Sequence, residues 1–462
     1  MDKSKLFALL ATFSNMEWKH FLMYLESPYL NKEPKLCSIG IWLFNNKERL
    51  GSLKRTEITP MVHLNPKQIN YTFSWLYHAG LQFLALEKMR SNPIPSEIVV
   101  AAVLGERGLE KQFDFQIART HRILQELPAK DAHYWQLNYN LNNLEGVQFV
   151  RKGERKTNPY LQSGSDSLDK FYFSEKLRYA CGMMNAQSIV ASTFNIHFVV
   201  EIVSFLETTP HWLHEPCIAV YYHIWKLMVL PDESHHHYQS LKNLIRSSSH
   251  CFSQEENAIH LGFALNFCIR QIRNVKEEYV AEALHLYEEG IQNKALLNDQ
   301  ILSPWHYKNI IRLGLRSGRY EWTEQFIIHK NTLLEHEYQS NALHFGFADL
   351  YFYTKRYALA KEHISQTDLS DIYNNLDAKE MLAKIYYETD EDDALFSHLH
   401  AFRTFLRRNK LVSEQVRKAY LNFLKLLEQS IHYTPDMLQH LKATIEKTEP
   451  LVAKSWLLEK CR

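Results

Sequence analysis

Residues 304–330 read PWHYKNIIRLGLRSGRYEWTEQFIIHK, and this stretch decides the fold class. From Tyr307 to Gly314, apolar and small residues recur at three- and four-residue spacing, which places them on one face of a helix. Gly318-Arg319-Tyr320 interrupts that pattern, and a second helical segment follows it. The stretch therefore predicts two helices joined by a short turn.

The same arrangement returns twice further along the chain. The second copy covers residues 344–360, and the third covers residues 378–394. Between the equivalent residues Thr323, Ala360 and Ala394 the period is 37 residues (323 to 360) and then 34 residues (360 to 394). A fainter copy precedes the first. Self-similarity at such a period is the signature of a repeat fold.

These copies resemble the tetratricopeptide repeat, a helix pair of about 34 residues with aromatic, small and alanine positions at these places. The match covers residues 257–405, although Thr323 replaces the usual alanine and the closing proline is missing. The resemblance implies antiparallel helix hairpins stacked as a right-handed solenoid. The segments Glu26–Asn31 and Leu168–Met184 are similar to uncharacterised bacterial helical proteins, and this similarity brings no function with it.

The remaining sequence also favours an all-α fold, with about twenty helices. Helix starts are marked by capping signals such as Ser14…Glu17 and Ser303-Pro304. Two prolines in Ser91–Pro95 end a helix. We therefore expect an N-terminal helical cap over residues 1–95 and a helical-repeat array over residues 96–462. A compact bundle of hairpins is the alternative to the solenoid.

Composition limits the compartment and the class of protein. Only 14 of 462 residues are glycine, and 53 basic residues balance 52 acidic ones. Neither nucleic acid nor an anionic membrane is attracted by such a charge balance. Six scattered cysteines without a C-x-x-C pair indicate reduced thiols, and no apolar stretch approaches the ~18 residues that span a bilayer. A cytoplasmic location is expected.

Catalytic and nucleotide-binding motifs are missing from the sequence. No glycine precedes a lysine as in a Walker loop, and neither G-x-G-x-x-G nor G-x-S-x-G occurs. We therefore expect no catalytic residues, no cofactor and no metal. His235-His236-His237 is the one cluster that could bind a metal, but adjacent residues on a loop rarely converge on one ion. A solvated polar loop is the expectation for this run.

Two charged runs have ordinary explanations beside functional ones. The acidic run Asp390–Asp393 falls between two predicted helices, where it would favour the start of the second. Arg403, Arg407, Arg408 and Lys410 form a basic cluster that could bind an acidic partner, although such a helix face is more often simply solvated. Trp322 and Trp456 lie in amphipathic patterns and are expected to pack in the core.

The resemblance also suggests where a partner binds. In tetratricopeptide-like arrays, the first helix of each pair lines a concave groove. Lys308 and Arg312 lie four residues apart, hence on one helix face. A mixture of cations and aromatic rings suits a peptide with an acidic group. The residues expected to line this groove are Trp305, Lys308, Arg312, Phe345, Asp349, Phe352, Lys379 and Tyr386.

The sequence leaves three classes of function open. A non-catalytic scaffold that binds a protein or peptide in its groove is the preferred hypothesis. A transcriptional regulator, with DNA-binding helices in residues 1–95 and a ligand-sensing array, is the alternative, but Pro66–Met89 carries few cations for reading a DNA groove. An enzyme that uses the histidine run is the third hypothesis. The partner's identity and the oligomeric state cannot be read from the sequence.

Overall fold

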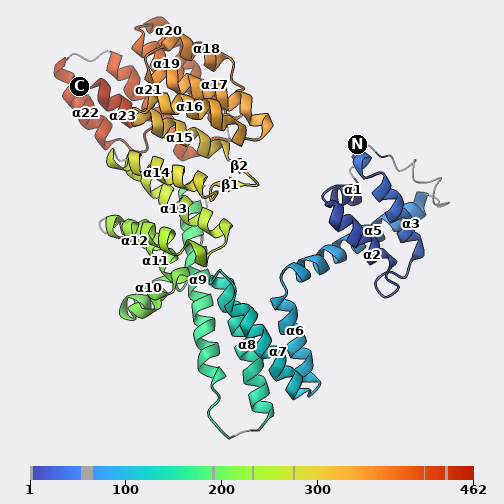
Figure 1. The fold of residues 1–462 in the computed structure, drawn as a ribbon. Coiled ribbons are helices and arrows are strands. Elements are labelled where there is room, and N and C mark those ends of the chain that lie inside the picture. The colour runs from blue at the N-terminus through green and yellow to red at the C-terminus, as the bar shows by residue number, and fades with distance from the viewer. Residues whose placement is uncertain are drawn as a thin grey trace. The chain divides into compact units, whose positions relative to one another are not determined.

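The computed structural model describes residues 4–51, 53, 66–153, 155–189, 193–230, 234–273, 276–409, 411–431 and 435–461. These residues form 22 α-helices, four short 3₁₀ helices and one two-stranded hairpin (Figure 1). The all-α class is confirmed. Among the described helices, none is both long enough and apolar enough to cross a membrane.

The chain separates into two compact units. The first comprises residues 1–127 and 137–164, and the second comprises residues 128–136 and 165–462. The boundary expected after residue 95 falls within the first unit, in the first turn of α6 (Ile94–Glu106), which follows α5 (Pro66–Ser91).

Helices make up the described elements of the first unit. Its core contains a cluster of aromatic rings in which Phe13 contacts Trp18, Phe21 and Phe83 at centroid distances of 5.5–5.7 Å. Beyond α5 and α6, the elements are α1 (Lys5–Leu10), α2 (Asn15–Glu26), α3 (Pro34–Asn45), the 3₁₀ helix η1 (Lys47–Arg49), α7 (Glu110–Gln125), most of α8 (Ala132–Arg151) and the start of α9 (Tyr160–Ile189).

The second unit continues from α8 and α9 through a long run of helices. Its elements are α10 (Val199–Thr208), η2 (Pro210–His214), α11 (Pro216–Val229), α12 (Ser234–Ser247), η3 (Ser249–Cys251), α13 (Gln254–Arg273), α14 (Glu278–Gln292), β1 (Leu297–Asn298), β2 (Ile301–Leu302), α15 (Pro304–Arg316), α16 (Tyr320–Lys330), η4 (Asn331–Leu333), α17 (His336–Tyr353), α18 (Tyr357–Ser365), α19 (Ile372–Glu388), α20 (Asp392–Arg408), α21 (Glu414–Ile431), α22 (Pro435–Lys447) and α23 (Lys454–Lys460).

The capping signals act as the sequence predicts. The Ser14 hydroxyl accepts a hydrogen bond from the Glu17 backbone N–H, and the Glu17 carboxylate accepts one from the Ser14 N–H, so α2 begins with a capping box. Ser303 caps α15 just before a proline. The two strands β1 and β2 pair antiparallel through Leu297 and Leu302, and a two-residue turn joins them.

The three sequence copies correspond to three helix hairpins: α15–α16, α17–α18 and α19–α20. Each hairpin turns at a residue in the left-handed region, namely Gly318 (φ 73°), Lys355 (φ 59°) and Asp390 (φ 56°). In each turn the next residue's N–H bonds back to a carbonyl five residues earlier, at 2.7–3.0 Å. This is a Schellman ending, and its recurrence at equivalent positions explains the repeat in the sequence. The acidic run occupies the third turn, as expected.

A small residue allows close packing within the first hairpin. A Cβ placed on Gly314 of α15 would lie 2.4 Å from the Thr323 hydroxyl of α16 and 3.0 Å from the Trp322 ring. Both Gly314 and Thr323 are buried, and the Thr323 hydroxyl donates to the Arg319 carbonyl at 2.8 Å. The helices can therefore approach this closely only because position 314 lacks a side chain.

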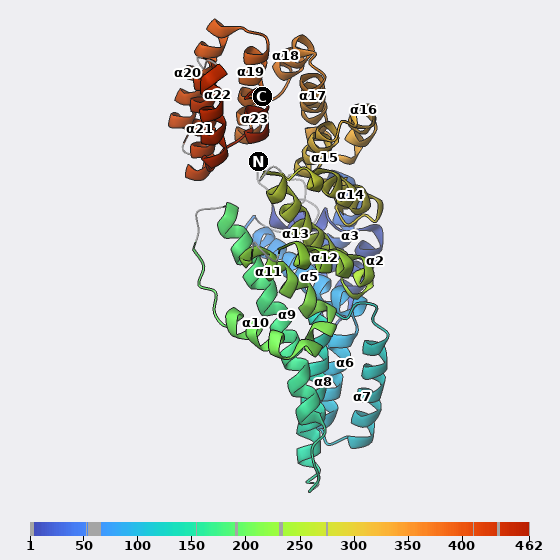
Figure 2. The ribbon, with the colours of Figure 1, turned by 90° about the vertical axis from the view of Figure 1, so that its left-hand side faces the viewer.

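In the second unit, successive helices pack against one another from α10 onward. Adjacent pairs such as α13–α14, α17–α18 and α20–α21 are in contact, and α15 also packs on α17 (Figure 2). One apolar core runs from Leu177 to Leu350, and separate cores lie within residues 345–385 and 376–457. The array is thus held together by contacts between neighbours.

We expect Gly314→Ala to lower the free energy of unfolding by about 1–3 kcal/mol, because the added methyl group overlaps Thr323. Gly262→Ala on α13 is the matched control, since a Cβ there meets nothing within 4 Å. That control should gain about 0.5–1 kcal/mol from helix propensity. Urea unfolding measures both changes.

Adding Thr323→Ala to Gly314→Ala removes the overlapping hydroxyl and should recover most of the loss. Equal stability of Gly314→Ala and the wild type would contradict the close approach of α15 and α16.

Candidate functional site

Three helices each contribute one stripe of side chains to a common surface, and the stripes of the first and third helices are charged. Residues at three- and four-residue spacing share a helix face, so each stripe lies along one side of its helix. α15, α17 and α19 are the first helices of the three hairpins, and we call the combined set the first-helix surface. It consists of Lys308, Arg312, Arg316, Phe345, Asp349, Phe352, Asp377, Glu380, Lys384 and Glu388.

The Asp377 carboxylate connects this surface. Its Oδ2 pairs with the Lys308 ammonium and lies 3.2 Å from Arg312 Nη2. Its Oδ1 accepts a hydrogen bond of 3.1 Å from the Tyr420 hydroxyl of α21. Arg312 also reaches Asp349, with Nε 3.3 Å from Oδ2. Carboxylates of the chain itself therefore neutralise both cations.

The ion pairs of this network stabilise the charged forms of their side chains. Burial by itself would raise the pKa of Asp377, but the charges of Arg312 and Lys308 lower it to about 2. Burial would lower the pKa of Arg312, yet Asp377 and Asp349 raise it well above its ordinary value. Burial, and then the Asp377 charge, raises the pKa of Tyr420. Asp377 therefore stays ionised and Tyr420 stays protonated near neutral pH.

Five of the eight predicted groove residues belong to the first-helix surface. They are not freely exposed: Phe345 and Asp349 are each 5% exposed, and only 17% of the Lys308 side chain is accessible. Phe345 lies beneath the Lys308 ammonium, 5.2 Å from ring centre to Nζ. Arg312 and Phe352 complete this set. In the structure, the two predicted binding cations form ion pairs with carboxylates of neighbouring helices.

The other three predicted residues lie elsewhere. The Lys379 ammonium lies 5.1 Å from the Phe405 ring centre, and the Tyr386 ring lies 5.6 Å from that of His398, so both residues face α20. Trp305 is 60% exposed at the start of α15.

On α19, the stripe that meets Lys308 and Arg312 begins at Asp377 and does not include the residues predicted for the groove on that helix. Lys379 is two residues from Asp377, and two residues correspond to about 200° around a helix. The spacing of Asp377, Glu380, Lys384 and Glu388 by three, four and four residues is the signal that could have revealed the stripe.

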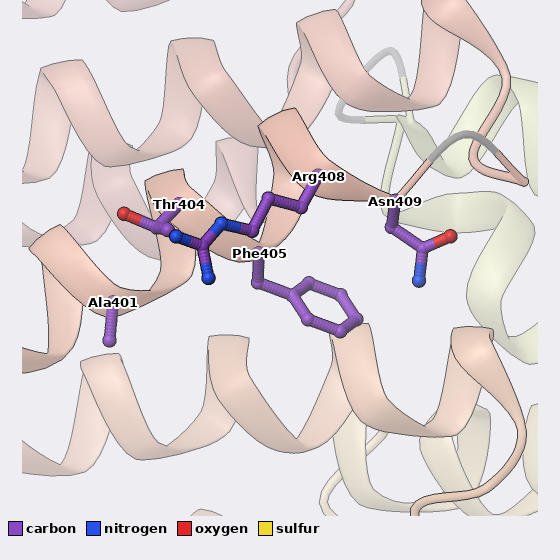
Figure 3. A pocket seen from close by; sticks show the side chains of 5 residues that line it. All are labelled: Ala401, Thr404, Phe405, Arg408 and Asn409. Atoms are coloured by element: carbon purple, nitrogen blue, oxygen red, sulfur yellow. The ribbon is translucent and has the colours of Figure 1, made fainter.

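An open depression of about 520 Å³ lies on α20 (Figure 3). The Arg408 side chain runs back along the helix toward Thr404, so its guanidinium lies beside the hydroxyl-bearing side chain (Figure 3). Lys379 approaches the Phe405 ring from α19, and burial lowers the pKa of this lysine. The residues that line the depression are Ala401, Thr404, Phe405, Arg408 and Asn409.

The residues of the predicted basic cluster differ in whether they form ion pairs. Arg403 pairs with Glu428 of α21 at 2.5 Å. Arg407 and Arg408 are exposed, and neither they nor Lys379 form an ion pair within the residues that the structure describes. Lys410 lies outside those residues. Of these unpaired cations, Arg408 lines the depression and Arg407 lies outside its lining.

The histidine run opens a helix, so the expected polar loop is wrong for these residues. His235–His237 occupy the first turn of α12, where His237 falls on the buried side with Leu241. His237 Nδ1 lies 2.9 Å from His223 Nδ1 of α11. Burial, and then the proximity of His237, lowers the pKa of His223 to about 4. Packing between α11 and α12 therefore explains the position of His237, one of the three histidines in the run.

A second buried histidine lies on α13. His260 is fully buried between the rings of Tyr221 and Phe252, at centroid distances of 5.0 and 4.6 Å. Neither of its nitrogens has a hydrogen-bond partner among the described residues, and burial lowers its pKa to about 3. One turn earlier, burial and then Asp131 raise the pKa of Glu256 to about 7. The interior at this point favours neutral side chains.

Within the described ranges, no three His, Cys, Asp or Glu side chains converge in a way that could hold a metal ion. Comparison of the chain with protein-family models, curated proteins and solved structures gives no match.

Replacing Asp377 should destabilise the protein and change its acid sensitivity. Near pH 7, Asp377→Asn should lower the free energy of unfolding, measured with urea, by about 3 kcal/mol, because two partly buried cations lose their counter-charge. The folded-state pKa lies below the ordinary value near 3.8, so this stabilisation is complete above about pH 4 and is lost as the pH falls through about 2.

The matched control is Asp393→Asn at an exposed carboxylate of α20, which should change stability by less than about 0.5 kcal/mol. A difference between wild type and Asp377→Asn that persists unchanged to pH 2 would rule out the proposed ion pairing.

His260 should make stability fall in acid. Its folded-state pKa near 3 lies below the ordinary value near 6.5, so the unfolded chain binds more protons between these values and stability declines as the pH drops below 6.5. Between pH 7.5 and pH 5, the free energy of unfolding of His260→Phe should therefore fall by about 2 kcal/mol less than that of the wild type. Identical pH dependence in both proteins would show that His260 is not held neutral.

Proposed function

We propose that this protein is a non-catalytic scaffold whose helix hairpins stack as a right-handed, tetratricopeptide-like solenoid and bind an acidic segment of another protein. The recurring left-handed turn and the packing of each helix on its neighbour support the solenoid. The six cysteines are all unpaired, which supports a reducing compartment such as the cytoplasm. An extended array offers a large surface for a partner.

The observation that carries the proposal is the distribution of unpaired positive charge. On the first-helix surface, Lys308 and Arg312 are neutralised by Asp377 and Asp349. An acidic ligand would have to displace these internal carboxylates. Around the α20 depression, by contrast, Arg408 has no carboxylate to displace among the described residues.

The chemistry of the depression suits a carboxylate or a phosphate carried on a peptide. The Arg408 guanidinium offers paired N–H donors that match such a group. Asn409 adds an amide NH2 donor, since its Oδ1 already accepts from the Leu411 N–H, whereas the Thr404 hydroxyl donates to the His400 carbonyl. The Phe405 ring provides an apolar surface for the flanking residue. Lys379 contributes a second positive charge close to that ring. Together these groups favour an acidic residue followed or preceded by an apolar one.

Charge reversal at Lys308 or Arg312 would not test binding cleanly. Either change would leave Asp377 or Asp349 without its partner in a closely packed region and would disturb folding. The site is better tested at exposed Arg408.

Affinity purification of the tagged full chain from its own host, at low and moderate salt, should recover a stoichiometric protein partner. Arg408→Glu should lower the affinity for that partner at least about tenfold, because it places a negative charge where the acidic group binds. Arg407→Glu is the matched control, since it reverses a neighbouring charge that is also exposed but lies outside the lining of the depression, and it should change affinity less than about threefold.

Equal loss in the two variants would indicate a non-specific charge effect. Unchanged binding in Arg408→Glu would remove the α20 site, and recovery of nucleic acid instead of protein would overturn the proposed function.

A further inference from the structure

The C-terminal helix α23 lies against one end of the first-helix surface. Ser455 Oγ accepts a hydrogen bond of 2.9 Å from Arg316 Nη2 of α15. Trp456 Nε1 donates to Glu388 Oε1 of α19 at 2.9 Å. Lys460 pairs with the same Glu388 carboxylate at 2.5 Å. Helix α23 thus touches the ends of α15 and α19, although 139 residues separate Ser455 from Arg316 in the chain.

Trp456 occupies the centre of this contact. Its ring lies 5.7 Å from the Lys384 ammonium, which also lies 5.9 Å from the Phe352 ring of α17. The Tyr387 ring meets the indole edge to face at 5.5 Å. Trp456 therefore packs as the sequence predicts, but the contacts of its N–H group are with a charged surface. Its indole is recognised by cation–π, aromatic and hydrogen-bond contacts together.

Helix α23 is a short element, and Trp456, Leu458 and the following Cys461 lie partly buried against the same core as Leu457. The helix has only seven residues and no side-chain cap at its start, so it has little stability by itself. Leu457 is its one buried residue within the described range, and it packs in the core formed with α21. The contacts with α15 and α19 include hydrogen bonds, one ion pair and the Tyr387–Trp456 ring contact, and a partner with the same groups could replace them one for one.

We propose that this end of the first-helix surface binds a helix of a partner protein, and that α23 occupies the surface as an internal competitor. The partner helix presents an indole followed four residues later by Lys or Arg, because Trp456 and Lys460 have that spacing and share one helix face. The acidic side chain of Glu388 receives both groups. The inference goes beyond the proposed binding of an acidic segment, since it concerns a different surface and a partner of opposite charge.

The probe is a labelled synthetic peptide with the sequence of residues 450–461, carrying Cys461→Ser, added to the full chain. The full-chain double variant Trp456→Ala/Lys460→Ala, which vacates the surface, should bind this peptide at least about tenfold more tightly than the wild type, where α23 competes. Adding Glu388→Lys to the vacated chain should abolish binding. A peptide with Trp456→Ala should not bind.

Arg408→Glu in the vacated chain is the control that separates the two surfaces. It should leave peptide binding unchanged, so loss of the acidic partner and loss of the helical probe are independent results. Equal peptide affinity of the vacated and wild-type chains would overturn the inference, and so would binding that survives Glu388→Lys.

Hydrogen exchange of the wild-type chain tests the inference without any variant. If α23 detaches locally, its backbone amides should exchange at least about tenfold faster than those of α21. Exchange of α23 that is as slow as that of α21 would make it a permanent part of the C-terminal core and would overturn the internal-competitor role.

Discussion

The Asp377 carboxylate lies between the Lys308 ammonium and an Arg312 guanidinium nitrogen, and it also accepts a hydrogen bond from Tyr420. This one group connects α15 and α19, the first helices of two different hairpins, with α21. A charge in such a position must be paired, since an uncompensated partly buried charge is costly. The pairing fixes how the first helices lie on one another, and it also removes two cations from the set that could attract a ligand. Both the packing of the array and the location of free positive charge follow from it.

Two surfaces with different chemistry result from this arrangement. The first-helix surface is balanced in charge and closely packed, and its far end is covered by α23 through Trp456 and Glu388. The α20 depression is open and keeps Arg408 unpaired among the described residues. A surface with balanced charge selects ligands whose charged groups match its own pairs. An unpaired cation attracts any acidic group, and the side chains around it determine which ligand binds best. The two proposals together give this chain two partners of unlike charge.

Much of the fold could be predicted from the sequence, because helix periodicity and turn chemistry are local. The copies around Thr323, Ala360 and Ala394 correspond to hairpins, and the left-handed residues at Gly318, Lys355 and Asp390 fall at equivalent positions. The site could be predicted only in part. That Lys308 and Arg312 share a face is local information, but their partner Asp377 lies more than sixty residues away, and periodicity cannot show such a pair. The burial of His237 likewise depends on His223 of the preceding helix.

The central claim is that an acidic segment of a partner protein contacts the α20 depression. The most direct measurement places a photo-crosslinking amino acid at Thr404 in the tagged full chain, expressed in its own host, with the same group at exposed Glu321 of α16 as the reference site. We expect one dominant protein adduct from position 404, mapped by mass spectrometry to a segment rich in Asp, Glu or phosphorylated residues, and none from position 321. A dominant protein adduct from position 321 with none from position 404 would contradict the central claim.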